Sequence, residues 1–163
     1  RRHPHVFGGD SSRDARHWEQ FKAEERAARG ASSAIDDVPL TLPALARAGK
    51  LGKRAARVGF DWPDAEGARD KVLDELEEID AARRGEGDSS LEEEVGDLLL
   101  AASSFARHLG VDPETALRRA NQRFEARFRA LEALAAARGL NPGRLDALEL
   151  DSLWEEVKRG IQS

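Results

Sequence analysis

Hydrophobic residues recur every three or four positions through most of the chain, and this spacing predicts amphipathic helices. In the clearest cases Val72, Leu76 and Ile79 share one face, and Leu117, Phe124 and Leu131 share another. No stretch alternates apolar and polar residues as an exposed strand does. Helices are predicted over residues 10–29, 41–58, 65–84, 90–109, 113–138 and 147–159.

Local signals mark where several of these helices begin and end. Ser90 and Glu93 have the spacing of a capping box, and Asp112-Pro113 supplies a cap followed by a first-turn proline. Gly110 and Gly139 follow the last apolar positions of two helices, where glycine commonly ends a helix. Short loops between long helices are typical of antiparallel neighbours, so we expect an all-α antiparallel helical bundle.

The first forty residues differ in character from the rest. Residues 10–29 form a polar, exposed helix in this interpretation, and "GASSAIDDVP" over 30–39 is a linker rich in small and turn-forming residues. The chain contains no methionine and opens on "RRHPHVFGGD", which suggests that it was cut from something longer. We therefore divide it into a tail with linker, 1–40, and a helical domain, 41–163.

Composition excludes several classes of function. Charged residues make up 35% of the chain and the formal net charge is −5, without the basic surplus or stripe that nucleic-acid binders carry. No apolar run approaches the roughly 18 residues of a membrane span. Cysteine is absent, which excludes disulfides and thiolate metal sites. These features predict a cytoplasmic protein that binds neither nucleic acid nor membrane.

Two pairs of acids lie beside apolar stripes. "LEEEVGDLLLAA", 91–102, reads as a buried helix that contains Glu94 and Asp97, and Glu75 and Glu78 repeat the same spacing one helix earlier. Glu78 lies roughly 9 Å before the end of its helix, and Glu94 lies roughly 6 Å after the start of the next helix. If the two helices are antiparallel, the two pairs of acids therefore face each other at nearly the same level. Four converging carboxylates need cations, and oxygen-only ligands favour Mg²⁺ before Mn²⁺.

Two other interpretations of the acids stay open at this point. Glutamate-rich helices are commonly just solvated, and such pairs arise often by chance. A carboxylate-bridged di-iron site would need Glu-x-x-His on facing helices, a spacing that the sequence lacks. His108 stands at a helix end, where it suits the helix dipole better than a metal.

Cationic and aromatic residues downstream suit a phosphate. Arg127 falls on the apolar stripe of 113–138 with Arg123 at its edge, and planar guanidinium groups bind phosphate oxygens well. Asn121 can donate to a phosphate or sugar oxygen, and Trp154 with Lys158 forms an i,i+4 pair near the C-terminus. The alternative is that both arginines pair with nearby acids, and that the tryptophan is core and the lysine surface.

Several segments, in order, resemble one known family. "KVLDELEEID" followed by "LEEEVGDLLLAASSFARHLGVDPETALRRANQRFEARFRALE" resembles the MazG nucleoside triphosphate pyrophosphohydrolases, as do "RRHPHVFG", "KRAARVGFDWP" and "LWEEVKR". The family pattern of Glu-Glu-x-x-Glu, a spacer and Glu-x-x-Asp is matched by Asp74-Glu75-x-x-Glu78 and Glu94-x-x-Asp97. "RRHPHVFG" resembles the end of a first domain, so residues 1–40 would be the tail of a preceding domain plus linker.

The resemblance implies an all-α homodimer that uses Mg²⁺ to cleave nucleoside and deoxynucleoside triphosphates to monophosphate and pyrophosphate. By position it makes metal ligands of Glu75, Glu78, Glu94 and Asp97. It also implies triphosphate-binding roles for a second set: Arg123, Arg127, Trp154 and Lys158, with Lys71 and Asn121 as further candidates. Asp74 and Arg123 depart from the family pattern, which has Glu at the first position and commonly Lys at the second.

The mechanism expected from these residues is metal-assisted hydrolysis. Water attacks the α-phosphorus, either Glu75 or Glu78 takes its proton, and Arg127 and Lys158 neutralise the leaving pyrophosphate. Base specificity is expected to be broad, with Trp62 or Trp154 available to stack on the base. The alternatives are a helical dimerisation or regulatory module with surface acids, and a decayed domain that binds nucleotide without turnover.

Overall fold

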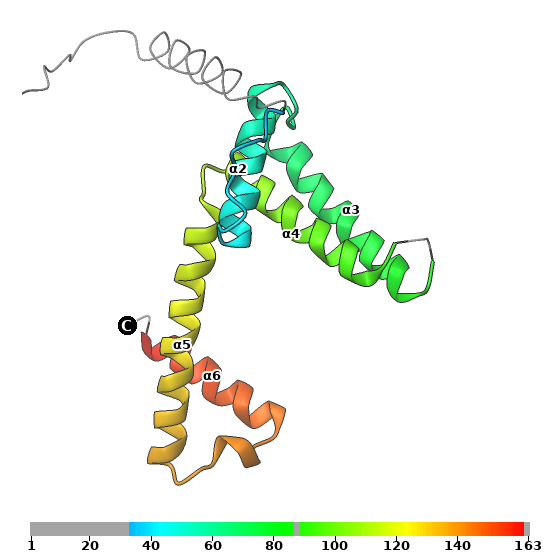
Figure 1. Ribbon diagram of the computed structural model, residues 1–163. Helices are drawn as coiled ribbons and strands as arrows, with labels where there is room; N and C mark the ends of the chain where they lie inside the picture. Colours follow the sequence, from blue (N-terminus) through cyan, green and yellow to red (C-terminus); the bar gives the residue numbers. More distant parts are fainter. Residues whose placement is uncertain (1–32, 87–88, 162–163) are drawn as a thin grey trace, which may run out of the picture.

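The computed structural model describes residues 33–86 and 89–161, and every regular element in that part of the chain is helical (Figure 1). This confirms the predicted all-α class. No described helix combines the length and apolarity that crossing a membrane requires. The predicted helix over 10–29 lies outside the described residues. The elements are α2 (Ala44–Arg57), α3 (Ala65–Arg83), α4 (Leu91–His108), α5 (Pro113–Ala137), the short 3₁₀ helix η1 (Pro142–Arg144) and α6 (Ala147–Ile161).

The predicted helix boundaries are confirmed where a capping residue marks them. Ser90 and Glu93 form the capping box: the Ser90 N–H donates to Glu93 Oε2 at 2.7 Å, and the Glu93 N–H donates to Ser90 Oγ at 3.2 Å. At the start of α5, Asp112 Oδ1 accepts from the Thr115 N–H at 2.8 Å. Gly110 and Gly139 follow two helices with φ of 73° and 67°, a region that glycine enters without strain.

Two local features differ from the prediction. Helix α2 begins at Ala44 rather than at residue 41, because Pro43 holds its N-cap position with ψ near 142° and disfavours helix in the residue before it. The 3₁₀ helix η1 between α5 and α6 was not predicted. It begins at Pro142 and is capped by the Asn141 side chain, which accepts from the Gly143 N–H at 3.0 Å.

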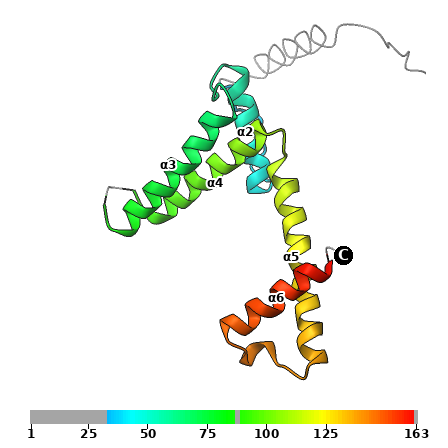
Figure 2. The same cartoon turned by 180° about the vertical axis from the view of Figure 1, so that it is seen from behind.

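The helices form two pairs rather than one closed bundle within a single chain. Helices α3 and α4 lie side by side as a hairpin, and α2 packs on α4 and on the start of α5 (Figures 1 and 2). Helix α5 then leads away from the hairpin, and α6 folds back against it. The hairpin and the α5–α6 pair are thus two separate packing units.

The buried core of the described residues is small. Between α5 and α6 it consists of Leu131, Ala135, Leu153 and Val157. The expectation that α4 is buried is wrong for a single chain, since Leu91, Val95, Leu99 and Leu100 are 42–55% exposed. Leu117 and Phe124 of the predicted α5 stripe are also about half exposed, at 48% and 58%. Apolar surface of this extent marks an interface more often than a free surface.

An ionic cluster fastens the turn before α3 to the end of α4. Arg107 Nη1 donates to Asp61 Oδ2 at 2.8 Å, Arg107 Nη2 also contacts Asp61 Oδ1, and His108 Nε2 lies 3.0 Å from Asp61 Oδ1. The hydrogen bonds from Arg107 lower the pKa of Asp61 from 3.8 to about 2, against the opposing effect of burial. His108 is the last residue of α4, which confirms its predicted place at a helix end.

Replacing Asp61 by Asn is expected to destabilise the fold at neutral pH by about 1–3 kcal/mol, because Arg107 loses its charged partner in a partly buried setting. The folded-state pKa lies below the unfolded one, so the ionised carboxyl stabilises the fold above about pH 4, and this contribution is lost as the pH falls toward 2. Urea unfolding of wild type and Asp61→Asn at several pH values measures the difference in their free energies of unfolding. It should be constant between about pH 5 and 7 and shrink below about pH 4.

The exposed Asp70 provides the control for this prediction, because its carboxyl is 67% exposed and pairs with Arg69 on the surface. Asp70→Asn is expected to change stability by less than about 0.5 kcal/mol. A gap between wild type and Asp61→Asn that persists undiminished at pH 2 would show that the cluster stabilises the fold through packing and not through charge.

Candidate metal centre

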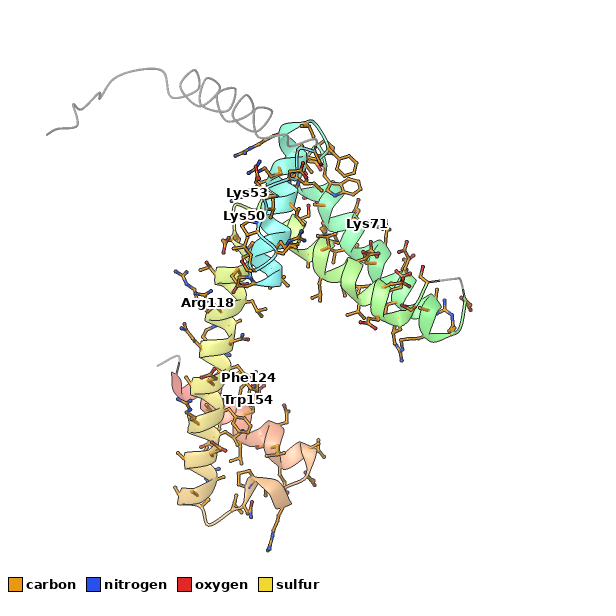
Figure 3. The ribbon with its side chains drawn as sticks, in the orientation of Figure 1. Lys50, Lys53, Lys71, Arg118, Phe124 and Trp154 are labelled. Carbon is orange, nitrogen blue, oxygen red and sulfur yellow. The ribbon has the colours of Figure 1, made fainter. Side chains whose placement is uncertain are left out.

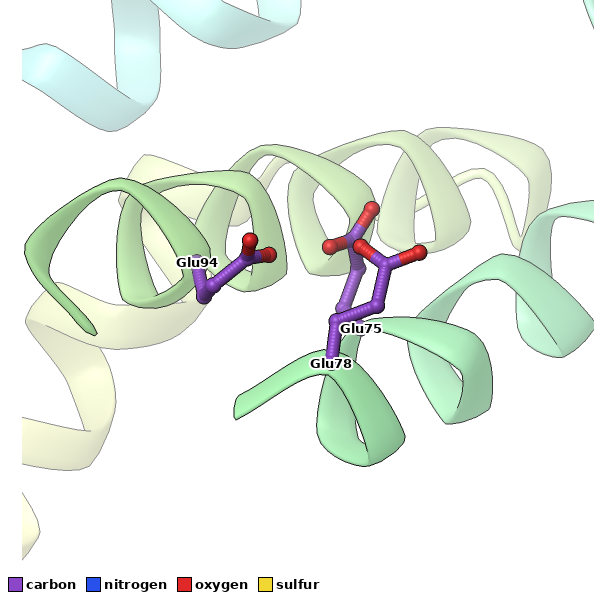
Figure 4. A group of neighbouring side chains, drawn as sticks. All are labelled: Glu75, Glu78 and Glu94. Atoms are coloured by element: carbon purple, nitrogen blue, oxygen red, sulfur yellow. The ribbon is translucent and has the colours of Figure 1, made fainter. Parts of the chain in front are cut away.

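Three carboxylates from two helices converge on the inner side of the hairpin. Glu75 and Glu78 of α3 and Glu94 of α4 each place an oxygen within 4.8 Å of the others (Figure 4). Glu75 and Glu94 are only 2% and 7% exposed, and they are the buried acids of the described residues. Glu78 lies at the open side, with half of its side chain exposed.

The helices position these side chains through spacing and capping. Glu75 and Glu78 are three residues apart and therefore lie on one side of α3. The capping box at Ser90 fixes the start of α4, and the Glu94 N–H donates to the Ser90 carbonyl at 3.1 Å in the first turn. A carboxylate near a helix N-terminus is favoured by the helix dipole, which offsets part of the cost of burying Glu94.

Lys71 enters this cluster from one turn earlier on α3. Its Nζ lies 2.5 Å from Glu75 Oε1 and 3.9 Å from Glu78 Oε1. The hydrogen bond to Glu75 raises the pKa of Lys71 above its ordinary value. For Glu78, attraction to Lys71 lowers the pKa, but repulsion from Glu75 and partial burial outweigh it and the net pKa is raised.

The second oxygen of Glu75 is the feature that best fits a bound cation. Glu75 Oε2 is buried and has no hydrogen-bond partner. A buried carboxylate oxygen without a partner is costly, and buried polar atoms are nearly always satisfied by a proton donor, water or an ion. Within the described part of the chain this group contains carboxylates alone, without histidine or cysteine, and such a set suits a hard divalent cation such as Mg²⁺. The residues present therefore fit a metal site.

Asp97, the fourth predicted ligand, lies outside this group. It is exposed on α4, one turn beyond Glu94, and is not among the acids whose oxygens lie within 4.8 Å of one another. The two acids share one side of α4 by their spacing, but Glu94 is buried against α3 whereas Asp97 is exposed.

The predicted triphosphate-binding residues lie on the other helix pair. Trp154 of α6 packs against Phe124 of α5 with ring centroids 5.6 Å apart, away from Lys71 on the hairpin (Figure 3). Lys158 is paired with Glu155 on the same helix. Arg127 is half-buried, and Asn121 and Arg123 are exposed on α5. Within a single chain, Lys71 is thus the one predicted triphosphate-binding residue that lies beside the acids. The other five candidates lie on α5 and α6, apart from the acids.

The ion pair between Lys71 and Glu75 was not predicted from the sequence. The family resemblance made Lys71 a further candidate for triphosphate binding, and the structure pairs it with Glu75. Their i,i+4 spacing is the signal that predicts this pairing, because side chains four residues apart meet on a helix surface. Trp62, considered for base stacking, is 43% exposed at the turn before α3, with its ring against Gly67.

Curated proteins of known sequence resemble the chain over nearly its whole length. A protein of Escherichia coli K12 named nucleoside triphosphate pyrophosphohydrolase is 47% identical over 165 aligned positions, covering 98% of the chain and 63% of that protein. One of Thermotoga maritima, named nucleoside triphosphate pyrophosphohydrolase/pyrophosphatase MazG, is 41% identical over 163 positions, covering 100% and 62%. The chain therefore spans less than two thirds of the length of these relatives. No model of a known protein family matches the chain.

Proposed function

The chain belongs to the MazG family of nucleoside triphosphate pyrophosphohydrolases, and we propose that it hydrolyses nucleoside and deoxynucleoside triphosphates to monophosphate and pyrophosphate with Mg²⁺. The carboxylate cluster with the unpartnered Glu75 Oε2 carries this proposal, because it offers buried negative charge and a free ligand atom at one place. The names of the two relatives support the substrate class.

Glu75, Glu78 and Glu94 would hold the metal, and Asp97 is proposed as a fourth ligand from its place one turn along α4. A bound Mg²⁺ supplies charge neutralisation of phosphate oxygens and lowers the pKa of a water molecule, and Mn²⁺ is a chemically similar substitute. Hydrolysis forms a bond from the water oxygen to the α-phosphorus and breaks the α–β bridging bond. Glu75 or Glu78 would receive the proton of that water, since both carboxylates belong to the cluster that would hold the metal.

The separation of acids and cations leads us to propose a homodimer. The α5–α6 pair of one copy would lie on the α3–α4 hairpin of the other, closing an antiparallel bundle from two chains. The half-exposed Leu99 of α4 and Phe124 of α5 are apolar surfaces that such packing would cover. Arg123, Arg127 and Lys158 would then reach the triphosphate bound at the partner's acids, with Asn121 donating to an oxygen and Trp154 supporting them.

Replacing Leu99 by Asp is expected to convert the dimer to monomer and to abolish turnover. In the single chain Leu99 is 55% exposed, so the substitution costs little stability there, whereas a buried unpaired carboxylate at an interface is strongly unfavourable. Size-exclusion chromatography with light scattering measures the mass. Leu40→Asp, at a residue 83% exposed on the loop before α2, should leave the dimer intact. A Leu99→Asp protein that stays dimeric would contradict this packing.

Broad base specificity is proposed because the candidate ligands address the metal and the triphosphate. The test incubates the chain with the eight common nucleoside and deoxynucleoside triphosphates, with Mg²⁺ or with EDTA, and separates the products by ion exchange. Monophosphate and pyrophosphate are expected for every base, and only with Mg²⁺. Diphosphate with orthophosphate would mean that a different bond is cleaved, and absence of turnover in an intact dimer would overturn the proposal.

A further inference from the structure

Lys71 occupies a position inside the carboxylate cluster that a metal ion would also seek. Its ammonium group contacts Glu75 Oε1 at 2.5 Å and reaches Glu78 Oε1 at 3.9 Å. The three clustered carboxylates carry three negative charges when ionised, and Lys71 offsets one of them. Without a cation, two carboxylates this close repel each other strongly, and one of them is buried.

The two partners of this ion pair differ in their freedom to move. The Glu75 side chain is 3% exposed and is held within the hairpin, whereas the Lys71 side chain is 36% exposed and lies at the rim. A lysine side chain has four rotatable carbon–carbon bonds and an ammonium group without directional preference. Lys71 is therefore the member of the pair that can withdraw toward solvent while the carboxylates stay in place.

We propose that Lys71 is an internal counter-ion of the metal site, which holds Glu75 and Glu78 together when no metal is bound and leaves Glu75 when a divalent cation enters. The proposal rests on the metal site of the proposed function. Because like charges repel, a dication bound through the free Glu75 Oε2 weakens the contact between the ammonium group and Oε1. The displaced ammonium group is then free for a triphosphate oxygen, so that metal entry adds a positive charge on the substrate side of the site.

A direct consequence is that Lys71 weakens metal binding in the absence of nucleotide. A neighbouring cation lowers the proton affinity of a carboxylate tenfold or more, and the same repulsion acts on a metal ion. Lys71→Met is accordingly expected to bind Mn²⁺ about tenfold more tightly than wild type without nucleotide. If Lys71 served only as a phosphate ligand, its removal would leave the affinity for free Mn²⁺ unchanged.

The experiment titrates Mn²⁺ into nucleotide-free protein and follows the free ion by electron paramagnetic resonance. Lys71→Arg keeps the charge and is expected to bind Mn²⁺ like wild type. Lys53→Met removes a positive charge from α2, away from the acids, and should also bind like wild type (Figure 3). An unchanged or weaker Mn²⁺ affinity of Lys71→Met would overturn the proposal, and circular dichroism confirms that each variant is folded.

The Glu94→Gln variant separates failure of this proposal from failure of the proposed function. If Glu94→Gln loses Mn²⁺ binding while Lys71→Met matches wild type, the metal site stands and only the counter-ion role is wrong. If wild type and Glu94→Gln bind Mn²⁺ alike, the metal site itself is wrong and both proposals fall.

A second measurement uses the wild-type side chain and does not depend on the folding of Lys71→Met. Lysine ammonium groups give sharp ¹⁵N–¹H signals only when an ion pair protects their protons from exchange. The chain has five lysines, so the Lys71 signal can be assigned by its loss in Lys71→Arg. It is expected to be visible without metal and to broaden or disappear as Mg²⁺ is added. A Lys71 signal that persists at saturating Mg²⁺ would overturn the proposal.

Discussion

Replacing Glu94 by Gln is expected to lower kcat for any nucleoside triphosphate by roughly a thousandfold or more, while the protein stays folded. Glu94 is 7% exposed and contributes an oxygen to the cluster with Glu75 and Glu78. Glutamine has nearly the same volume but no charge, so the hairpin keeps its packing while the metal loses a ligand. A metal stabilises the transition state by several kcal/mol, and each 1.36 kcal/mol lost is about tenfold in rate.

Glu92 provides the matched control for Glu94. It lies in the same first turn of α4 but is exposed, and it is not part of the carboxylate cluster. Glu92→Gln should retain kcat within about twofold and melt like wild type, because surface substitutions of this kind rarely matter. Full activity in Glu94→Gln would remove Glu94 from the metal ligands, and with it the main support for the site.

Replacing Arg127 by Ala is expected to reduce kcat about a hundredfold, because one charged donor to the transition state is lost. Mixing this inactive variant with inactive Glu94→Gln should then restore activity. In the proposed dimer each site takes its acids from one chain and its arginine from the other. A mixed dimer therefore contains one site with both parts intact, and random exchange of subunits leaves about a quarter of all sites active.

The mixing experiment needs subunit exchange, which mass spectrometry of isotope-labelled dimers can verify. Glu94→Gln alone and Arg127→Ala alone, treated in the same way, together give the background rate. Activity that does not rise above this background, despite verified exchange, would show that the acids and Arg127 of one chain act together. The α5–α6 pair would then have to fold onto its own hairpin, in contrast to the arrangement in Figures 1 and 2.

Local signals predicted the described helices well. The capping box of Ser90 and Glu93 and the cap at Asp112 concern residues three apart, so their geometry depends on the helix alone. The convergence of Glu75, Glu78 and Glu94 was also predicted from the sequence, because a short loop favours an antiparallel pair of neighbouring helices and the residue count predicts the level of each acid. These inferences needed no knowledge of distant contacts.

Features that depend on distant residues or on a second chain were not predictable in the same way. Asp61 and Arg107 are 46 positions apart, and neither sequence neighbourhood indicates the other. The apolar pattern of α4 predicted burial, but Leu99 is half exposed in one chain. Such a pattern shows only that an apolar helix face is covered by another surface, and not whether the same chain or a second copy supplies that surface. Periodicity likewise placed Glu94 and Asp97 on one side, although only Glu94 is buried.

The central claim is that the acids of the hairpin hold the metal while the α5–α6 pair of a second copy holds the triphosphate. A crystal structure with Mn²⁺ and an α,β-methylene triphosphate analogue, which resists cleavage, tests it most directly. The account predicts anomalous density for Mn²⁺ among Glu75, Glu78 and Glu94, with Arg127 and Lys158 of the other copy on the triphosphate. Mn²⁺ elsewhere, or a triphosphate bound without these carboxylates and cations, would contradict it.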